Sequence, residues 1–152
     1  MALLKKFKKR NPDGFGLCTP TINFKGLDYD KFIKVVKTIS ENEQVLIHLR
    51  YATAGSIRDS NCHPFLDKAT NTYFMHNGVL NYTPKDDITD SEYAFREYII
   101  PLLIYGINSK EIDICINHII GASRFALMQN NDVKLFGTWY EYHGLMLSNM
   151  RF

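Results

Sequence analysis

Two helical patterns in the middle of the chain, with strand patterns on both sides, limit the folds that this sequence can adopt. Apolar residues at helical spacing predict a long helix opened by Asp90-Ser91 and continuing to Gly106, kinked or ended at Pro101, and a second helix over 109–120 capped by Asn108 or Ser109. Segments rich in branched and aromatic residues predict strands within 44–53, 71–82 and 123–149. This order of elements favours an α+β domain or a layered αββα domain.

Shorter patterns predict the rest of the architecture. Two amphipathic helices are expected near the start of the chain, over 2–10 and 29–39, the first ended by Asn11-Pro12 and the second capped by Asp28 or Asp30. The tail over 123–149 predicts a meander of three antiparallel strands, with turns near 130–132 and 143–144.

Composition narrows the class of protein. A length of 152 residues and a hydrophobic content of 45% predict one globular domain over 1–152. A net charge of +2 is too small to indicate nucleic acid as a partner, and the basic face of helix 2–10 reads as a solvated surface or a site for an acidic partner. Three widely spaced cysteines fit free thiols in a reducing compartment. We expect a cytoplasmic protein that does not bind a membrane.

The stretch HLRYATAGSIRDSNCHPF, residues 48–65, concentrates hydrogen-bonding side chains at the end of a predicted strand. His48 and Arg50 are two residues apart and point to the same side of that strand. The planar guanidinium of Arg50 suits a carboxylate, which predicts a pocket for a small acidic ligand. The alternative is a structural Arg50 that pairs with Asp59 or Asp67.

Two later segments complete a possible site. Asn77-Gly78 offers a side-chain amide and a backbone N–H to one oxygen, as an oxyanion hole does, although this pair is also a common hairpin turn. Asp90 is either a helix N-cap or a partner for a ligand ammonium group. An arginine for a carboxylate, an aspartate for an ammonium group and an oxyanion hole together fit a free amino acid with a reactive side-chain carbonyl, such as glutamine.

Six short motifs give the sequence a resemblance to a known family. The motifs NPDGFG (11–16), HLRYATAG (48–55), NCHPF (61–65), HNGVL (76–80), TDSE (89–92) and LSN (147–149) occur in the order and approximate spacing of class II glutamine amidotransferase domains. These are N-terminal-nucleophile hydrolases, and the resemblance is to the short stand-alone type of bacteria and their phages. It covers nearly the whole chain and implies a four-layer αββα sandwich with glutamine bound at the ends of facing antiparallel sheets.

The resemblance also implies roles for particular residues. Arg50 and Thr53 would bind the glutamine α-carboxylate, Asp90 would bind the α-ammonium group, and Asn77 and Gly78 would form the oxyanion hole.

No cofactor and no metal ion are expected. The resemblance implies that the motif histidines His63 and His76 shape the substrate-binding pocket rather than carry protons. Together with His48 and Cys62 they could converge on a metal, but the sequence has none of the close ligand pairs typical of zinc sites.

The start of the chain departs from the family pattern. Members of the family use an N-terminal cysteine whose own amine activates its thiol, whereas this sequence begins Met1-Ala2. The segment ALLKKFKKRNPDGFG (2–16) resembles the helix that normally follows the first strand in the family, so the first strand is expected to be missing. Three explanations stay open: a late start, a strand supplied by another polypeptide, or a non-catalytic descendant. Cys18 and Cys62 are weaker substitutes because neither carries the required amine.

Two functions follow as hypotheses. The first is a glutaminase or amidotransferase domain that binds glutamine and releases ammonia by acyl transfer, catalytically incomplete in this chain, with a protein partner or acceptor enzyme. The second is a non-catalytic interaction or inhibitor protein on the same fold, including one encoded by a phage. Whether the chain is an enzyme is left open by the missing cysteine.

Overall fold

The computed structural model describes residues 2–82 and 87–151 and shows a mixed α+β chain with several antiparallel sheets. Met1, at which the departure from the family pattern begins, lies outside the described residues. Within the described part of the chain, no helix combines the length and the apolar character needed to cross a membrane.

The first sheet is built from the N-terminal third of the chain. Its strand order is β2-β1-β3, with antiparallel pairing throughout and bounds of Phe15–Cys18 for β1, Asn23–Gly26 for β2 and Leu46–Leu49 for β3. Phe15 and Leu17 of β1 pack against Phe32 of helix α2 (Tyr29–Val36) in a buried apolar cluster. Leu4 of helix α1 (Ala2–Arg10) packs against the same cluster, so the apolar faces of both helices cover this sheet.

The two N-terminal helices agree with the sequence prediction. They span Ala2–Arg10 (α1) and Tyr29–Val36 (α2). The Asp28 side chain caps α2 by accepting the backbone N–H groups of Asp30 and Lys31. The backbone N–H of Asn11 donates to Phe7 O just before Pro12, where α1 ends.

The second sheet has the strand order β4-β5-β6-β7, again antiparallel. Its strands span Phe65–Asp67 (β4), Thr72–Asn77 (β5), Arg124–Gln129 (β6) and Asp132–Phe136 (β7). One face packs on the central helices through a core that includes Phe74, Phe95 and Phe125. The opposite face packs on the first sheet through Tyr73, Met75 and Met128, in one cluster with Cys18.

The long helix expected over 90–106 is present as three consecutive helical segments. They are an α-helix over Asp90–Ala94 (α3), a π-helix over Phe95–Ile99 (η2) and a 3₁₀-helix over Ile100–Tyr105 (η3). Pro101 lies at the start of the 3₁₀ segment, where its missing N–H fits. Asp90 is not the N-cap: Thr89 is, because its hydroxyl accepts the backbone N–H of Glu92. Helix α4 spans Lys110–Ile119 and is capped by Ser109, as predicted.

The predicted three-stranded meander at the end of the chain is wrong. Residues 123–149 instead form two hairpins in different sheets: β6 with β7, and β8 (Tyr140–Tyr142) with β9 (Leu145–Leu147). The separation falls at Gly137, whose φ of +85° turns the chain away from the second sheet. The two predicted turns do lie between the strands of each hairpin.

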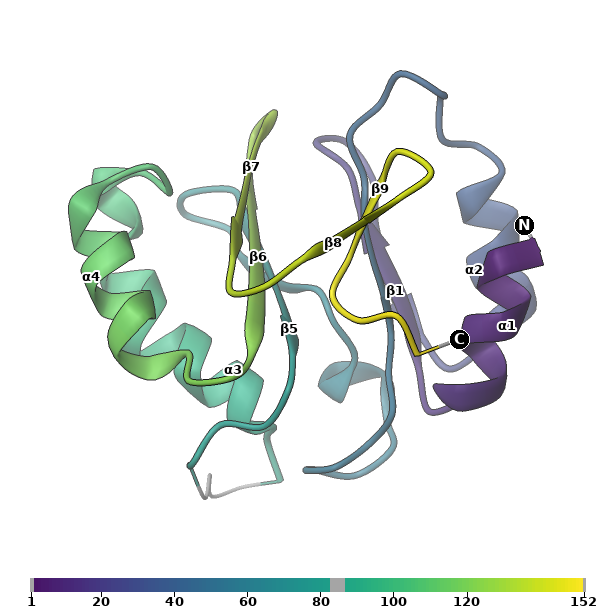
Figure 1. Cartoon of the computed structure of the whole chain (residues 1–152), viewed down its shortest axis with the longest axis horizontal. Helices are drawn as coiled ribbons and strands as arrows, with labels where there is room; N and C mark the ends of the chain where they lie inside the picture. Colours follow the sequence, from purple (N-terminus) through teal and green to yellow (C-terminus); the bar gives the residue numbers. More distant parts are fainter. Residues whose placement is uncertain (1, 83–86, 152) are drawn as a thin grey trace.

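Figure 1 shows how these elements are arranged. Helices α1 and α2 lie outside the sheet that contains β1, and α3 and α4 lie outside the sheet that contains β5 and β6. The β8–β9 hairpin crosses in front of the region between the two sheets. A short 3₁₀ turn over Asp59–Asn61 (η1) belongs to the long connection from β3 to β4.

Candidate functional site

A cavity of about 510 Å³ opens where β3 and β5 end. Its lining comes from the end of α1, from β3 and the loop after it, from β5 and the turn after it, from the start of α3, and from the tail after β9. All six residues predicted to form the site line this cavity: Arg50, Thr53, His76, Asn77, Gly78 and Asp90.

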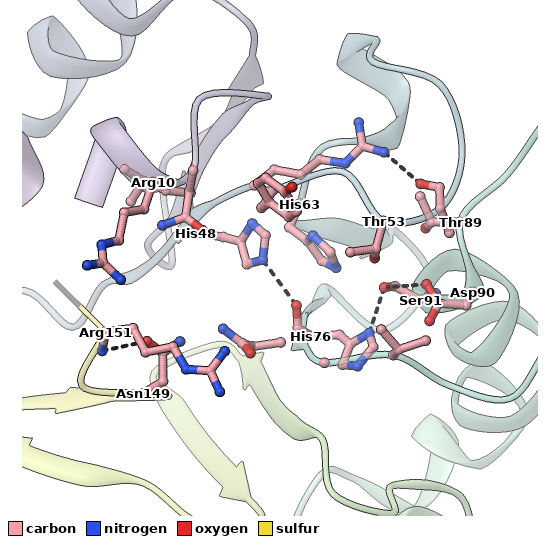
Figure 2. A pocket seen from close by; sticks show the side chains of 18 residues that line it. Arg10, His48, Thr53, His63, His76, Thr89, Asp90, Ser91, Asn149 and Arg151 are labelled. Carbon is pink, nitrogen blue, oxygen red and sulfur yellow. Dashed lines mark hydrogen bonds between the residues drawn. The ribbon is translucent and has the colours of Figure 1, made fainter. Parts of the chain in front are cut away.

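The two sheets meet at the cavity through a histidine. His48 Nε2 lies 3.1 Å from the carbonyl oxygen of His76 and donates to it, which joins β3 of the first sheet to β5 of the second. Figure 2 shows this bond beside the rings of His63 and His76. The strand ends therefore carry their polar side chains into one shared space.

Arg50 is buried, with 4% of its surface exposed. Its guanidinium donates to backbone carbonyls of the following loop: Nη1 to Ser56 O at 3.0 Å, and Nη2 to Ala54 O at 2.8 Å and Gly55 O at 3.3 Å. The proposed structural pairing of Arg50 with Asp59 or Asp67 is therefore wrong, because carbonyl oxygens take that place. These bonds fix the loop that presents Thr53 to the cavity.

The same loop is held from outside by Asp87. Its carboxylate accepts the Ser56 backbone N–H at 2.8 Å and the Ser56 hydroxyl at 2.5 Å. The fully buried Asn61 donates to the carbonyl oxygens of Ser56 and Asp87. Hydrogen bonds with Arg50, Asn61 and Asp87 therefore hold in place the loop that forms the cavity wall near Arg50.

Asp90 connects α3 to the turn that follows Asn77. One carboxylate oxygen accepts the Leu80 backbone N–H at 2.7 Å, and the other accepts the Ser91 backbone N–H at 2.9 Å. The residue is 5% exposed and lines the cavity. A carboxylate has about four lone-pair sites, so Asp90 can still accept from a ligand.

The Asn77-Gly78 segment requires glycine. Gly78 has φ of +139°, and a Cβ there would collide with the side chain of Ser123. The Asn77 side-chain amide donates to Ser148 Oγ at 3.0 Å, which ties the tail after β9 to the cavity. An amide nitrogen carries two hydrogens, so the second remains for a ligand oxygen.

His76 is hydrogen-bonded on one side only. Its Nδ1 lies 2.7 Å from Ser91 Oγ, whereas its buried Nε2 has no hydrogen-bond partner among the described residues. Burial lowers the pKa of His76 to about 4, with the nearby Asp90 carboxylate acting in the opposite direction. Burial also lowers the pKa of His48 to about 4. Both imidazoles are therefore neutral near pH 7.

His63 is more unusual. It is 5% exposed, and neither ring nitrogen has a hydrogen-bond partner within residues 2–82 and 87–151. The ring packs against His48 at 4.2 Å and Phe65 at 4.8 Å between centroids, and it lines the cavity. The backbone of His63 lies so close to β1 that Gly16 has no room for a Cβ. These two unsatisfied ring nitrogens in the cavity wall are available to a water molecule or a ligand.

The three cysteines are not in the described lining of this cavity, although Cys62 directly precedes the lining residue His63. Cys18 is fully buried between the sheets, and burial raises its pKa to about 12. Burial also raises the pKa of Cys62. Cys115 lies on α4 beside Tyr98. Among the described residues none of them lines the cavity, and no group of three or more His, Cys, Asp or Glu side chains is placed to hold a metal ion.

Several lining residues were not predicted. Ser91, which is hydrogen-bonded to His76, lies within the motif TDSE, and Asn149 lies within the motif LSN. Ser148 of LSN is outside the described lining but accepts from the Asn77 amide. The motifs include these residues, although their contacts could not be predicted from the sequence. Arg10 and Arg151 also line the cavity. Arg10 was interpreted as part of a solvated helix face, and nothing in the local sequence of Arg151 indicated a site.

A model of the family described as "Glutamine amidotransferases class-II" matches residues 29–117, which is more than half of the chain. The chain belongs to this family. No curated protein matches the chain.

The part of this class II glutamine amidotransferase chain that matches extends from α2 to α4 and includes every predicted site residue. The motifs NPDGFG and LSN lie outside it. The family implies glutamine as substrate, which agrees with the class of ligand expected from the polar groups at the strand ends.

Proposed function

We propose that the cavity binds glutamine and that the domain serves to release ammonia from it by acyl transfer, as a glutaminase or amidotransferase domain. The observation that carries this proposal is the convergence of Arg50, Asp90 and the Asn77-Gly78 turn on one cavity. We further propose that the helices and facing sheets form a four-layer αββα sandwich, with glutamine at the strand ends.

Each role suits the contacts of its residue. Arg50, with its five donors only partly used, would bind the α-carboxylate together with Thr53. Asp90 would accept from the α-ammonium group. The second hydrogen of the Asn77 amide and the Gly78 N–H would donate to the γ-carbonyl oxygen, where negative charge develops in the transition state.

The reaction also needs a thiol. Because none of the cysteines in the described part of the chain lines the cavity, we propose that an additional strand with an N-terminal cysteine supplies it, ahead of Ala2 or from a partner polypeptide. Strand β3 suits this role: it is an edge strand among the described residues, and His48 and Leu49 at its end line the cavity.

In that arrangement the thiol sulfur attacks the γ-carbonyl carbon and the C–N bond breaks. The cysteine amine, which accepts the thiol proton, returns it to the departing ammonia, and water then hydrolyses the thioester. Without such a strand, the second candidate is a non-catalytic module that keeps the amino-acid pocket. The position of Cys18, Cys62 and Cys115 outside the described lining of the cavity favours this alternative for the chain by itself.

Calorimetric titration of the purified chain with glutamine, using Arg50→Gln as the control, tests the binding step. Saturable binding that the substitution abolishes is expected, and no binding would refute the pocket. An ammonia assay tests the chemistry. We expect no turnover by the chain alone and turnover by a version extended with a Met-Cys strand. Turnover by the unextended chain would show that another nucleophile is used.

A further inference from the structure

The cavity contains a second set of polar residues that the binding of glutamine does not use. Arg10 and Asn11 reach it from the end of α1, and Asn149 and Arg151 reach it from the tail after β9. In Figure 2, Arg10, Asn149 and Arg151 lie toward one end, with the histidines His48, His63 and His76 between them and the opposite end, where Thr53, Thr89, Asp90 and Ser91 lie.

This second end is cationic. It carries the guanidinium groups of Arg10 and Arg151, whereas the one carboxylate in the described lining, that of Asp90, lies at the opposite end. Asp90 is already bonded to two backbone N–H groups. Within residues 2–82 and 87–151, neither Arg10 nor Arg151 forms an ion pair with a carboxylate. The two arginines therefore have donors available to a ligand.

The ordinary explanation for Arg10 is the favourable position of a basic side chain at a helix C-terminus. The last turn of α1 carries Lys8, Lys9 and Arg10. Lys8 Nζ lies 4.3 Å from the ring centroid of Tyr29, on the side of α2. Arg10 is the member of this turn that lines the cavity, so the helix-dipole explanation does not account for where its side chain lies.

A substrate bound in the proposed orientation would extend from the Arg50 end of the cavity toward the Arg10 and Arg151 end. With its α-carboxylate at Arg50 and its γ-carbonyl at Asn77-Gly78, a γ-glutamyl group would direct its amide nitrogen away from Thr53 and toward Arg10 and Arg151. Glutamine has nothing beyond that nitrogen. A cavity of about 510 Å³ lies within the range of ~300–1,000 Å³ that holds drug-sized ligands, which are larger than glutamine.

We infer that the cavity accepts γ-glutamyl amides whose amine portion carries a carboxylate or another anionic group, and that Arg10 and Arg151 bind that group. This inference rests on the proposed binding of the glutamyl part. Arginine suits the role because its planar fork binds a carboxylate in a bidentate manner. Asn11 and Asn149 add amide donors beside it.

The test uses a matched pair of ligands. γ-Glutamylglycine and γ-glutamylglycinamide have nearly the same shape and differ in the terminal carboxylate. Calorimetric titration at low salt is expected to give an affinity about tenfold higher for the acid, the order of one good charge-assisted pair, with a smaller difference at high salt. The double variant Arg10→Gln/Arg151→Gln is expected to remove the preference, whereas Lys9→Gln in the same turn keeps it.

The outcomes separate this inference from the proposed function. If glutamine binds but the acid and its amide bind equally, the anionic subsite is refuted and the glutamine pocket stands. A preference that persists in the double variant also refutes it, because the charge is then recognised elsewhere. If neither glutamine nor either γ-glutamyl ligand binds, the glutamine pocket fails and the inference fails with it.

Discussion

Asp90 at the start of α3 accepts the backbone N–H of Leu80 at 2.7 Å, across a separation of ten residues. This bond fixes the turn that begins at Asn77-Gly78 relative to the helix. Because the same carboxylate lines the cavity, under the proposed function one side chain would both shape the oxyanion hole and accept from the substrate ammonium group.

Replacing Asp90 should separate these two contributions. Asp90→Ala leaves the buried N–H groups of Leu80 and Ser91 without their acceptor, so urea unfolding should show a loss of about 2–4 kcal/mol. Asp90→Asn keeps one acceptor and removes the charge, so it should lose less stability but still bind glutamine weakly. Glu97→Gln, at an exposed position of the neighbouring π-helix, is the control. Unchanged glutamine affinity in Asp90→Asn would remove Asp90 from the ligand site.

Gly78→Ala should distort the same turn. The alanine is strained at φ +139° and also collides with Ser123, so we expect a loss of about 1–3 kcal/mol in unfolding free energy and loss of glutamine binding. Adding Ser123→Gly removes the two closest contacts, with Ser123 Oγ and Cβ, and leaves the contact with its Cα and the strain, so the double variant should recover part of the stability.

The control for this series is Gly144→Ala. Gly144 has φ of +77° but open space around it, so its substitution measures strain alone. If Gly78→Ala costs no more stability than Gly144→Ala, the close contact with Ser123 does not constrain the turn.

How far the sequence predicts this site depends on the range of the interaction. Apolar spacing predicts α1 and α2, and each predicted pair of cap candidates includes the residue that caps the helix, Asp28 for α2 and Ser109 for α4, because these features are local. The first sheet could not be assembled in this way, since β1 and β2 have four residues each and β1 also pairs with the more distant β3. Strand β4 was missed because three residues are too few to show a periodic pattern.

The hydrogen-bond partners of a side chain are harder to predict from the sequence than the part of the fold in which the side chain lies. Arg50 lies in the cavity as expected, yet its guanidinium bonds to Ala54, Gly55 and Ser56 carbonyls, because the loop after β3 folds back over it. Asp90 was weighed as an N-cap, but the preceding Thr89 has the geometry to cap α3. Such choices between adjacent polar residues depend on backbone angles that the sequence does not state.

The buried histidines predict a pH dependence of stability. His48 and His76 have pKa values of about 4 in the folded protein, against 6.5 as the ordinary value. Their unfolded forms therefore bind more protons between those values, and the unfolding free energy should fall as pH decreases from about 6.5 to about 4. Each histidine contributes at most about 1.4 kcal/mol per pH unit in that window.

Urea unfolding at a series of pH values measures this effect. His48→Gln should flatten the dependence between pH 6.5 and 4, whereas His118→Gln, at an exposed position of α4, should not. An unfolding free energy that stays constant through this window would mean that the imidazoles become charged in the folded protein as readily as in the unfolded chain.

The same substitution at two histidines should have opposite effects on stability. His63→Phe replaces a buried ring whose nitrogens have no hydrogen-bond partner in the described part of the chain and keeps the aromatic contacts with His48 and Phe65. Removing unsatisfied polar atoms should leave the free protein as stable as before or more stable, by up to about 2 kcal/mol. His76→Phe instead breaks the 2.7 Å hydrogen bond to Ser91 and should destabilise the protein.

Glutamine titration of the same variant tests whether a bound ligand provides the hydrogen-bond partner of the His63 ring nitrogens. If a bound ligand supplies their partner, His63→Phe should lower glutamine affinity in calorimetric titration even though its unfolding free energy is not reduced. A loss of stability in His63→Phe comparable to that of His76→Phe would instead mean that the His63 ring nitrogens are satisfied in the free protein, and that their role is structural.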